Sequence, residues 1–168
     1  MPTSSIEVCT DLSCDGRQSL AGGDFLDDEK LYRGFSADEL VDGKLPVEAM
    51  RFPDMSCNWS RFACPCDVRL RLKGGRPVND GCFSFTISDA RFGNYVVVVH
   101  DPMCGGQTSE NHVGENYSHC EVRELREDDS EGFVPPRNRK IKGKQRRLEW
   151  RVNLKEKLAI ELLPIVGD

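Results

Sequence analysis

The sequence predicts an α+β fold: a single small domain with a mixed or antiparallel sheet of four to five strands and a few short helices. Three observations predict it. The chain has 168 residues, which suits one domain. Several short segments alternate apolar and polar residues, as strands with one buried face do. Helical spacing occurs only in short stretches, which argues against a doubly wound sheet.

The amino-terminal segment, residues 1–23, is small, polar and without apolar periodicity. It offers too little apolar surface to offset the entropy of ordering a chain, so we expect it to be disordered or loosely packed and the domain to span residues 24–166. The first strand is expected over Lys30–Phe35, which is rich in aromatic and apolar residues. Ser36 and Glu39 have the spacing of a capping box, which predicts a short helix there.

The middle of the chain supplies the rest of the predicted sheet. Residues 64–73 fit a half-buried strand and a helix equally well, because apolar residues alternate after a proline that can open a helix. Cys82–Ser88 and His119–Leu125 alternate clearly and are expected to be strands. Tyr95–Val99 is a continuous β-branched run, which predicts a strand buried on both faces and therefore central in the sheet.

The carboxy-terminal part begins with an acidic linker, residues 126–136, that ends in two prolines. A basic segment, residues 137–147, follows it and carries seven Lys or Arg and no acid. Residues 148–154 alternate, which predicts a strand. The leucines within 154–162 have helical spacing, which predicts a helix that stops before Pro164.

Composition limits the class of protein. Apolar residues make up 38% and charged residues 30% of the chain, and no apolar run approaches the ~20 residues of a membrane-spanning helix. The first residues lack a basic start followed by an apolar stretch, so we expect no secretory signal and a cytoplasmic location. The eight cysteines are then expected to be free thiols. The net charge of −5 argues against binding nucleic acid with the whole surface.

A histidine-centred site is the strongest local signal. His100 closes the predicted central strand, Asp101 follows it, and His119 opens a later strand. A rigid strand that ends in an open loop is a common place for functional groups. Two imidazoles with a carboxylate are suited to acid–base work, and the alternative is that both histidines are partly buried and tie a loop to the sheet.

Cysteines and a further histidine suggest a second chemistry. Zinc accepts sulfur and imidazole ligands in a tetrahedron, yet no spacing here matches an established zinc pattern. We therefore expect no cofactor, with zinc as the alternative and cysteines packed as small apolar residues as the commoner arrangement. The candidate ligands are Cys57, Cys64, Cys66, Cys104, His112 and Cys120.

The basic segment is the candidate partner-binding surface. It contains no aromatic residue, so base stacking is unsupported, and nucleic acid is a less favoured partner than protein. A solvated sheet edge protected by lysines is the plainer interpretation. Trp150 is large enough to anchor an interface. The contact candidates are Arg137, Arg139, Lys140, Lys142 and Trp150.

Four short motifs resemble a family of short bacterial proteins of uncharacterised function. They are Leu31-Tyr-Arg33, Phe52–Ser56 followed by Trp59, His100-Asp-Pro102, and Asn116-Tyr-Ser-His-Cys-Glu-Val122. The resemblance covers roughly residues 30–125. Where that family has a second Arg, an Asp and a Pro, this chain has Gly34, Asn58 and Tyr117.

The resemblance implies a shared pocket but no established activity. Its residues are Tyr32, Arg33, His100, Asp101, Asn116 and His119. Relatives look like accessory genes, some near mobile-element or antiviral-defence loci.

These observations favour a non-enzymatic accessory subunit that binds a protein encoded in its own operon, with antiviral defence as the context the resemblance suggests. The absence of a specific catalytic motif in the sequence and the segregated charge motivate this interpretation. The first alternative is a histidine-centred hydrolytic or nucleotide-directed enzyme in which Arg33 holds an anionic group. The second is an RNA-contacting protein that uses the basic segment.

Overall fold

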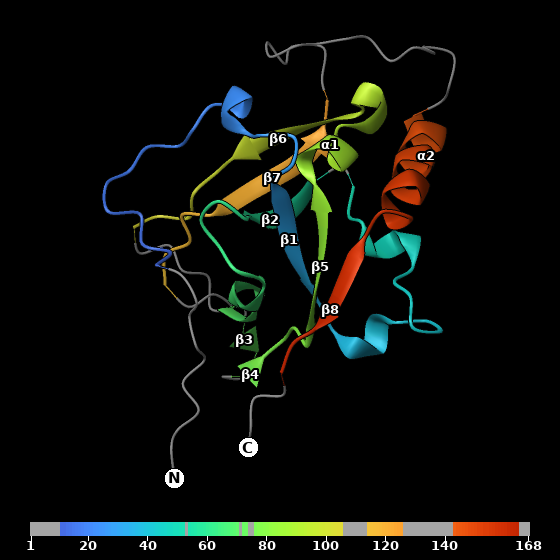
Figure 1. Ribbon diagram of the computed structural model, residues 1–168, viewed down its shortest axis with the longest axis horizontal. Coiled ribbons are helices and arrows are strands. Elements are labelled where there is room, and N and C mark those ends of the chain that lie inside the picture. Colours follow the sequence, from blue (N-terminus) through green and yellow to red (C-terminus); the bar gives the residue numbers. More distant parts are fainter. Residues whose placement is uncertain are drawn as a thin grey trace.

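A six-stranded antiparallel sheet forms the centre of the molecule (Figure 1). The computed structural model describes residues 11–52, 54–70, 72–73, 76–105, 114–125 and 143–164. Within them the strand order is β6-β7-β2-β1-β5-β8, and a separate two-stranded ribbon pairs β3 with β4. The strands are β1 (Lys30–Phe35), β2 (Asp54–Trp59), β3 (Leu72–Lys73), β4 (Arg76–Pro77), β5 (Gly81–Thr86), β6 (Val96–His100), β7 (His119–Glu124) and β8 (Ala159–Leu162).

The helices are few and short, as the sequence predicts. The α-helices are α1 (Ile87–Ala90) and α2 (Gly143–Lys155). Short 3₁₀-helices precede or connect the strands. None of the helices in the described part of the chain has both the length and the apolar content needed to cross a membrane. The 3₁₀ segments are η1 (Gly22–Asp24), η2 (Ala37–Glu39), η3 (Val47–Ala49), η4 (Pro65–Leu70) and η5 (Phe92–Asn94).

The α+β class is confirmed, but the main sheet has six strands where we expected four to five. Strands β1, β5 and β7 form where they were predicted, β1 from its aromatic and apolar content and the other two from alternation. Strand β2 was not predicted, because its polar residues Asp54, Ser56 and Asn58 obscure the apolar face formed by Met55, Cys57 and Trp59.

The valine run forms a strand, but its predicted central position is wrong. Strand β6 lies at one edge of the sheet and pairs only with β7. Residues 21–23, which include part of η1, lie along its outer side and line a pocket together with Val96–Val98. A loop thus covers the edge where a further strand was expected, and Val96 and Val98 are 5% and 1% exposed without one.

The order of elements at the carboxy-terminal end is the reverse of the prediction. The helix α2 comes first, and β8 follows and pairs with β5. Trp150 and Leu154, four residues apart, are each 1% exposed, whereas Leu148 and Val152 face solvent. Apolar residues at every second position therefore lie on both the buried and the exposed side of α2. Trp150 and Leu154, which have i, i+4 spacing, hold the helix on the core.

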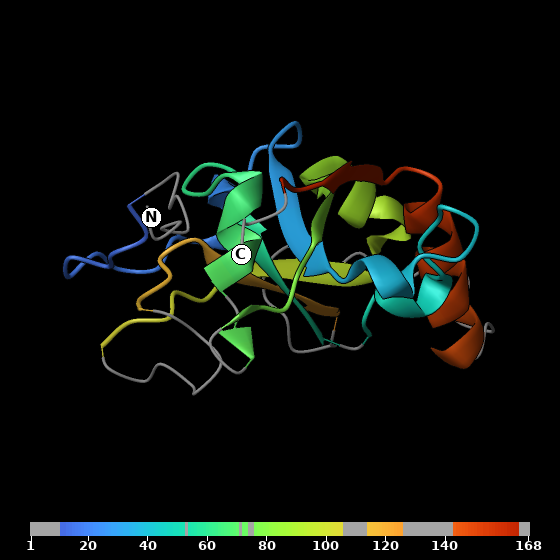
Figure 2. The ribbon, with the colours of Figure 1, turned by 90° about the horizontal axis from the view of Figure 1, so that it is seen from below.

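Aromatic side chains dominate the core. Trp59 is fully buried and stacks on Phe25 with ring centroids 3.9 Å apart. Trp150 joins the same cluster from α2 and donates from Nε1 to the carbonyl oxygen of Ala90 at 2.8 Å. The face of the sheet that carries Leu31 and Phe85 is buried with these rings. The helix α2 lies at the opposite end of the molecule from the loop of residues 11–20 (Figure 2).

A disulfide bond joins the amino-terminal loop to the segment after β6. Cys14 and Cys104 are bonded across 90 residues, and Cys66 is also disulfide-bonded, so the expectation of free thiols is wrong for these three. Leu12 and Cys14 are buried although they fall within the segment expected to be disordered or loosely packed. The free thiols among the described residues are Cys57, Cys64, Cys82 and Cys120.

Candidate functional site

His100 is a buried structural residue. Its Nδ1 accepts a hydrogen bond from the backbone N–H of Leu20 at 2.9 Å, and its Nε2 lies 2.6 Å from the carbonyl oxygen of Tyr117. The first contact requires a lone pair on Nδ1, so Nε2 carries the proton and donates it. Trp59 and Phe62 pack against the ring. With both nitrogens bonded and 4% exposure, this imidazole links the amino-terminal loop to the sheet and is unsuited to acid–base work.

His100 is expected to make stability depend on pH. Burial lowers the pKa of His100 below its ordinary value of 6.5. The unfolded chain therefore takes up a proton at a pH where the folded protein does not, and stability present above about pH 6.5 is lost as the pH falls, by at most about 1.4 kcal/mol per pH unit. Urea unfolding at several values between pH 5.5 and 7.5 measures this slope. The variant His100→Gln should be less stable but should lose this part of the slope, and an unchanged slope in the variant contradicts the assignment.

His119 lies on the other face of the sheet. His100 pairs with Cys120 across β6 and β7, and neighbouring residues of a strand point to opposite faces. The ring of His119 instead lies near Asp101 and Glu121, with its Nδ1 2.7 Å from the Asp101 carbonyl oxygen. The two histidines therefore share no pocket, and the predicted pairing of their imidazoles is wrong.

Of the remaining pocket residues, Tyr32 and Asn116 lie near His119 through Asn58, which pairs with Tyr32 on β1 and with His119 on β7. Asn116 is 2% exposed and donates from Nδ2 to Oδ1 of Asn58 at 2.8 Å. Arg33 donates from Nη1 to the Ser56 carbonyl at 2.7 Å, beyond the point where β1 and β2 cease to pair. Tyr32 packs against the small apolar cluster of η4 and β5, and burial raises its pKa. These contacts hold strands and loops of the fold together.

The proposed zinc ligands are not gathered at one point in the described part of the chain. Cys57 and Cys120 face each other across β2 and β7, and burial raises the pKa of Cys57 to about 12 and that of Cys120 well above its ordinary value. A thiol that resists ionisation is a poor metal ligand. Cys66 and Cys104 are disulfide-bonded, Cys64 is half-buried, and His112 lies outside the described residues.

A polar cluster that we did not predict as a unit lies where β6 ends and β7 begins. One ligand atom from each of Asp101, His119 and Glu121 lies within 4.8 Å of the others. Ser56 on β2 donates from its hydroxyl to Oε1 of Glu121 at 3.0 Å. The signal was present in the sequence, because His119 and Glu121 are two residues apart in a predicted strand and so share a face.

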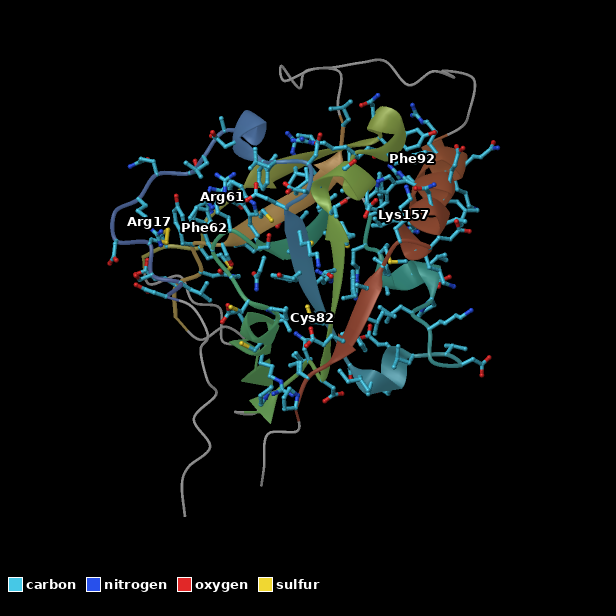
Figure 3. All side chains as sticks on the ribbon, in the orientation of Figure 1. Arg17, Arg61, Phe62, Cys82, Phe92 and Lys157 are labelled. Atoms are coloured by element: carbon cyan, nitrogen blue, oxygen red, sulfur yellow. A yellow bond between two sulfur atoms is a disulfide. The ribbon has the colours of Figure 1, made fainter. Side chains whose placement is uncertain are left out.

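A shallow groove of about 450 Å³ lies on the outer side of α2. Its apolar members are Phe92, Leu148 and Val152, which are 40%, 51% and 44% exposed. Phe92 and Lys157 lie together beside α2 (Figure 3), with the Lys157 ammonium 5.4 Å from the centre of the ring. The polar residues that complete the groove are Gln145, Glu149, Asn153 and Glu156.

Of the predicted partner-binding residues, the structure describes Trp150. Arg137, Arg139, Lys140 and Lys142 lie outside the described residues. Trp150 is 1% exposed and hydrogen-bonded in the core, so its predicted role as a surface contact is wrong. The side chains that α2 presents to solvent are instead Leu148 and Val152. Comparison with known proteins finds no matching family model, curated protein or solved structure.

Proposed function

We propose that this protein is a non-enzymatic accessory subunit that binds an acidic segment with apolar anchors on a partner protein, itself encoded in the same operon. The observation that supports this proposal is the exposed apolar groove of α2. Antiviral defence stays the context that the sequence resemblance suggests.

The apolar part of the groove is not needed for the fold. Trp150 and Leu154 already hold α2 on the core, while Leu148 and Val152 lie one helical turn apart on the solvent side with Phe92 beside them. Apolar side chains grouped in a groove and ringed by polar residues are typical of protein-binding sites. An apolar partner side chain seated here removes three such groups from water.

The charge of α2 indicates which partner fits. The helix carries five Lys or Arg and one Glu over Gly143–Lys155, and it directly continues the basic segment. Glu149 already accepts a hydrogen bond from the Tyr95 hydroxyl at 3.0 Å, and Arg147 pairs with Glu124 at 2.8 Å. Because Glu149 and Glu156 line the groove itself, the Asp or Glu residues of such a partner would meet the Lys and Arg of α2 outside its rim.

Two observations bear on the alternatives. The bonded state of both His100 nitrogens supports a non-enzymatic role over the histidine-centred enzyme. The proposal includes the cytoplasmic location expected from the sequence. The Cys14–Cys104 disulfide argues against that location, because disulfides are typical of oxidising compartments.

The test is site-specific photo-crosslinking of the full chain in its native cells, with p-benzoylphenylalanine in place of Leu148. We expect one crosslinked protein whose attached peptide, identified by mass spectrometry, contains Asp or Glu beside apolar residues. With that partner purified, the double variant Leu148→Ser, Val152→Ser should bind at least about tenfold more weakly, because loss of a buried apolar anchor costs more than about 1 kcal/mol.

Leu26→Ser is the matched control, because Leu26 is 56% exposed but lies outside the groove, and its binding should equal that of the unaltered chain. Equal melting temperatures establish that all the variants fold. A crosslink only to a second copy of this chain, a crosslink only to RNA, or equal partner binding by the double variant overturns the proposal.

A further inference from the structure

We infer that Asp101, His119 and Glu121 form a binding site for a divalent first-row transition-metal ion at the end of β6 and the start of β7. This site is independent of the α2 groove, because α2 lies at the opposite side of the molecule from the start of β7 (Figure 1). One ligand atom of Asp101, which follows β6, lies within 4.8 Å of one each from His119 and Glu121, which lie on β7. The backbone N–H of Asp101 donates to the His119 carbonyl oxygen at 3.0 Å, which holds the two segments in register.

The orientation of His119 is the observation that points to a cation. Its Nδ1 lies 2.7 Å from the Asp101 carbonyl oxygen, so Nδ1 carries a proton and donates it. In the neutral ring Nε2 then has a lone pair, and it lies 3.6 Å from Oε1 of Glu121, beyond hydrogen-bond distance. The residue is 9% exposed. The His119 side chain is 11% exposed, and a lone pair that faces a carboxylate oxygen is repelled by it unless a proton or a metal ion lies between them.

The surroundings of the cluster match those of known metal sites. A ligating imidazole usually donates its other N–H to a carbonyl or carboxylate, and ligating carboxylates are themselves hydrogen-bonded. Here the Asp101 carbonyl performs the first role and the Ser56 hydroxyl, 3.0 Å from Glu121, performs the second. Metal–nitrogen and metal–oxygen bonds of about 2.0–2.2 Å put neighbouring tetrahedral ligands roughly 3.4 Å apart, close to the spacing of His119 and Glu121.

The donor set selects the class of ion. One imidazole nitrogen with two carboxylate oxygens suits Zn²⁺ or Mn²⁺, whereas Ca²⁺ and Mg²⁺ prefer oxygen alone. Asp101 is exposed, so its side chain can rotate toward the ion and the outer coordination positions stay open to water. The rival arrangement is a proton on Nε2, which makes His119 and Glu121 a plain ion pair.

The experiment titrates the untagged, disulfide-intact chain with Mn²⁺, followed by electron paramagnetic resonance of the free ion, and with Zn²⁺, followed by calorimetry. We expect one ion per chain and Ca²⁺ affinity at least about tenfold weaker. His119→Gln and Glu121→Gln should each weaken binding by more than about 100-fold, since even the loss of an outer hydrogen bond to a ligand costs 10–100-fold.

Glu115→Gln is the control, because Glu115 belongs to the other candidate cluster, with Cys14 and Cys104, whose sulfurs are joined in a disulfide. Its affinity should equal that of the unaltered chain. X-ray absorption of the zinc form should show nitrogen and oxygen neighbours only. Any of four results overturns the site and supports the ion pair of His119 and Glu121 instead. They are absence of stoichiometric Mn²⁺ and Zn²⁺ binding, sulfur in the coordination sphere, equal Ca²⁺ affinity, and full affinity in folded His119→Gln.

Discussion

Replacement of Trp150 by alanine is expected to lower the free energy of unfolding by about 3–5 kcal/mol, as for other large aromatic residues removed from a core. The side chain is 1% exposed, and its ring lies edge-on to Phe52 with centroids 5.4 Å apart. It also holds α2 against the carbonyl of Ala90. Loss of the ring therefore opens a cavity and removes the main attachment of the helix.

Trp150→Phe is the matched variant, because it keeps most of the apolar volume but leaves the Ala90 carbonyl without its donor. The expected loss is about 1–3 kcal/mol. Urea unfolding followed by circular dichroism measures both variants. If Trp150→Ala instead leaves stability within about 0.5 kcal/mol of the unaltered chain, as surface substitutions do, the tryptophan is not part of the core.

The disulfide between Cys14 and Cys104 is expected to contribute about 2–5 kcal/mol, because it closes a long loop of the unfolded chain, with 90 residues of sequence separation. The double variant Cys14→Ser, Cys104→Ser should lose this stability. The disulfide anchors the loop of residues 11–20, so the contacts of that loop should weaken as well. One of them is the cation–π contact of the Arg17 guanidinium, 3.8 Å from the centre of the Tyr117 ring. Hydrogen exchange should accordingly rise over residues 11–20 more than in the strands.

Cys64→Ser, which removes a half-buried thiol and no disulfide, is the control and should change stability by less than about 1 kcal/mol. Equal stability of the double variant and the unaltered chain contradicts a stabilising crosslink. Alkylation of thiols in intact native cells, before lysis, extends the test to the compartment. Protection of Cys14 and Cys104 from the reagent indicates an oxidising environment, whereas full labelling supports the predicted cytoplasm.

Local pattern was enough to predict three strands. Lys30–Phe35 is rich in aromatic and apolar residues, and Cys82–Ser88 and His119–Leu125 alternate. These patterns are local, so β1, β5 and β7 form close to where they were expected. The valine run similarly predicts that β6 is extended. Its position in the sheet was not predictable, because a β-branched run is buried equally well by a strand or by the loop at residues 21–23.

The candidate sites show the same division. The sequence predicts that histidines and acids gather near the ends of two strands, and His119 does meet Asp101 and Glu121. It cannot show that β6 and β7 pair with His100 opposite Cys120, and this register sends the two imidazoles to opposite faces. In α2, alternation over residues 148–154 predicts a strand, and only packing on the core separates Trp150 from Leu148.

The amino-acid sequence alone predicts the α+β class, the extended state of β1, β5, β6 and β7, and the residue types available for chemistry, because each depends on neighbours within a few positions. The order of the strands, the helical state of α2, the bond between Cys14 and Cys104 and the face on which each histidine lies depend on contacts between distant segments. Those contacts form only when the whole core packs, and several arrangements satisfy the same local pattern.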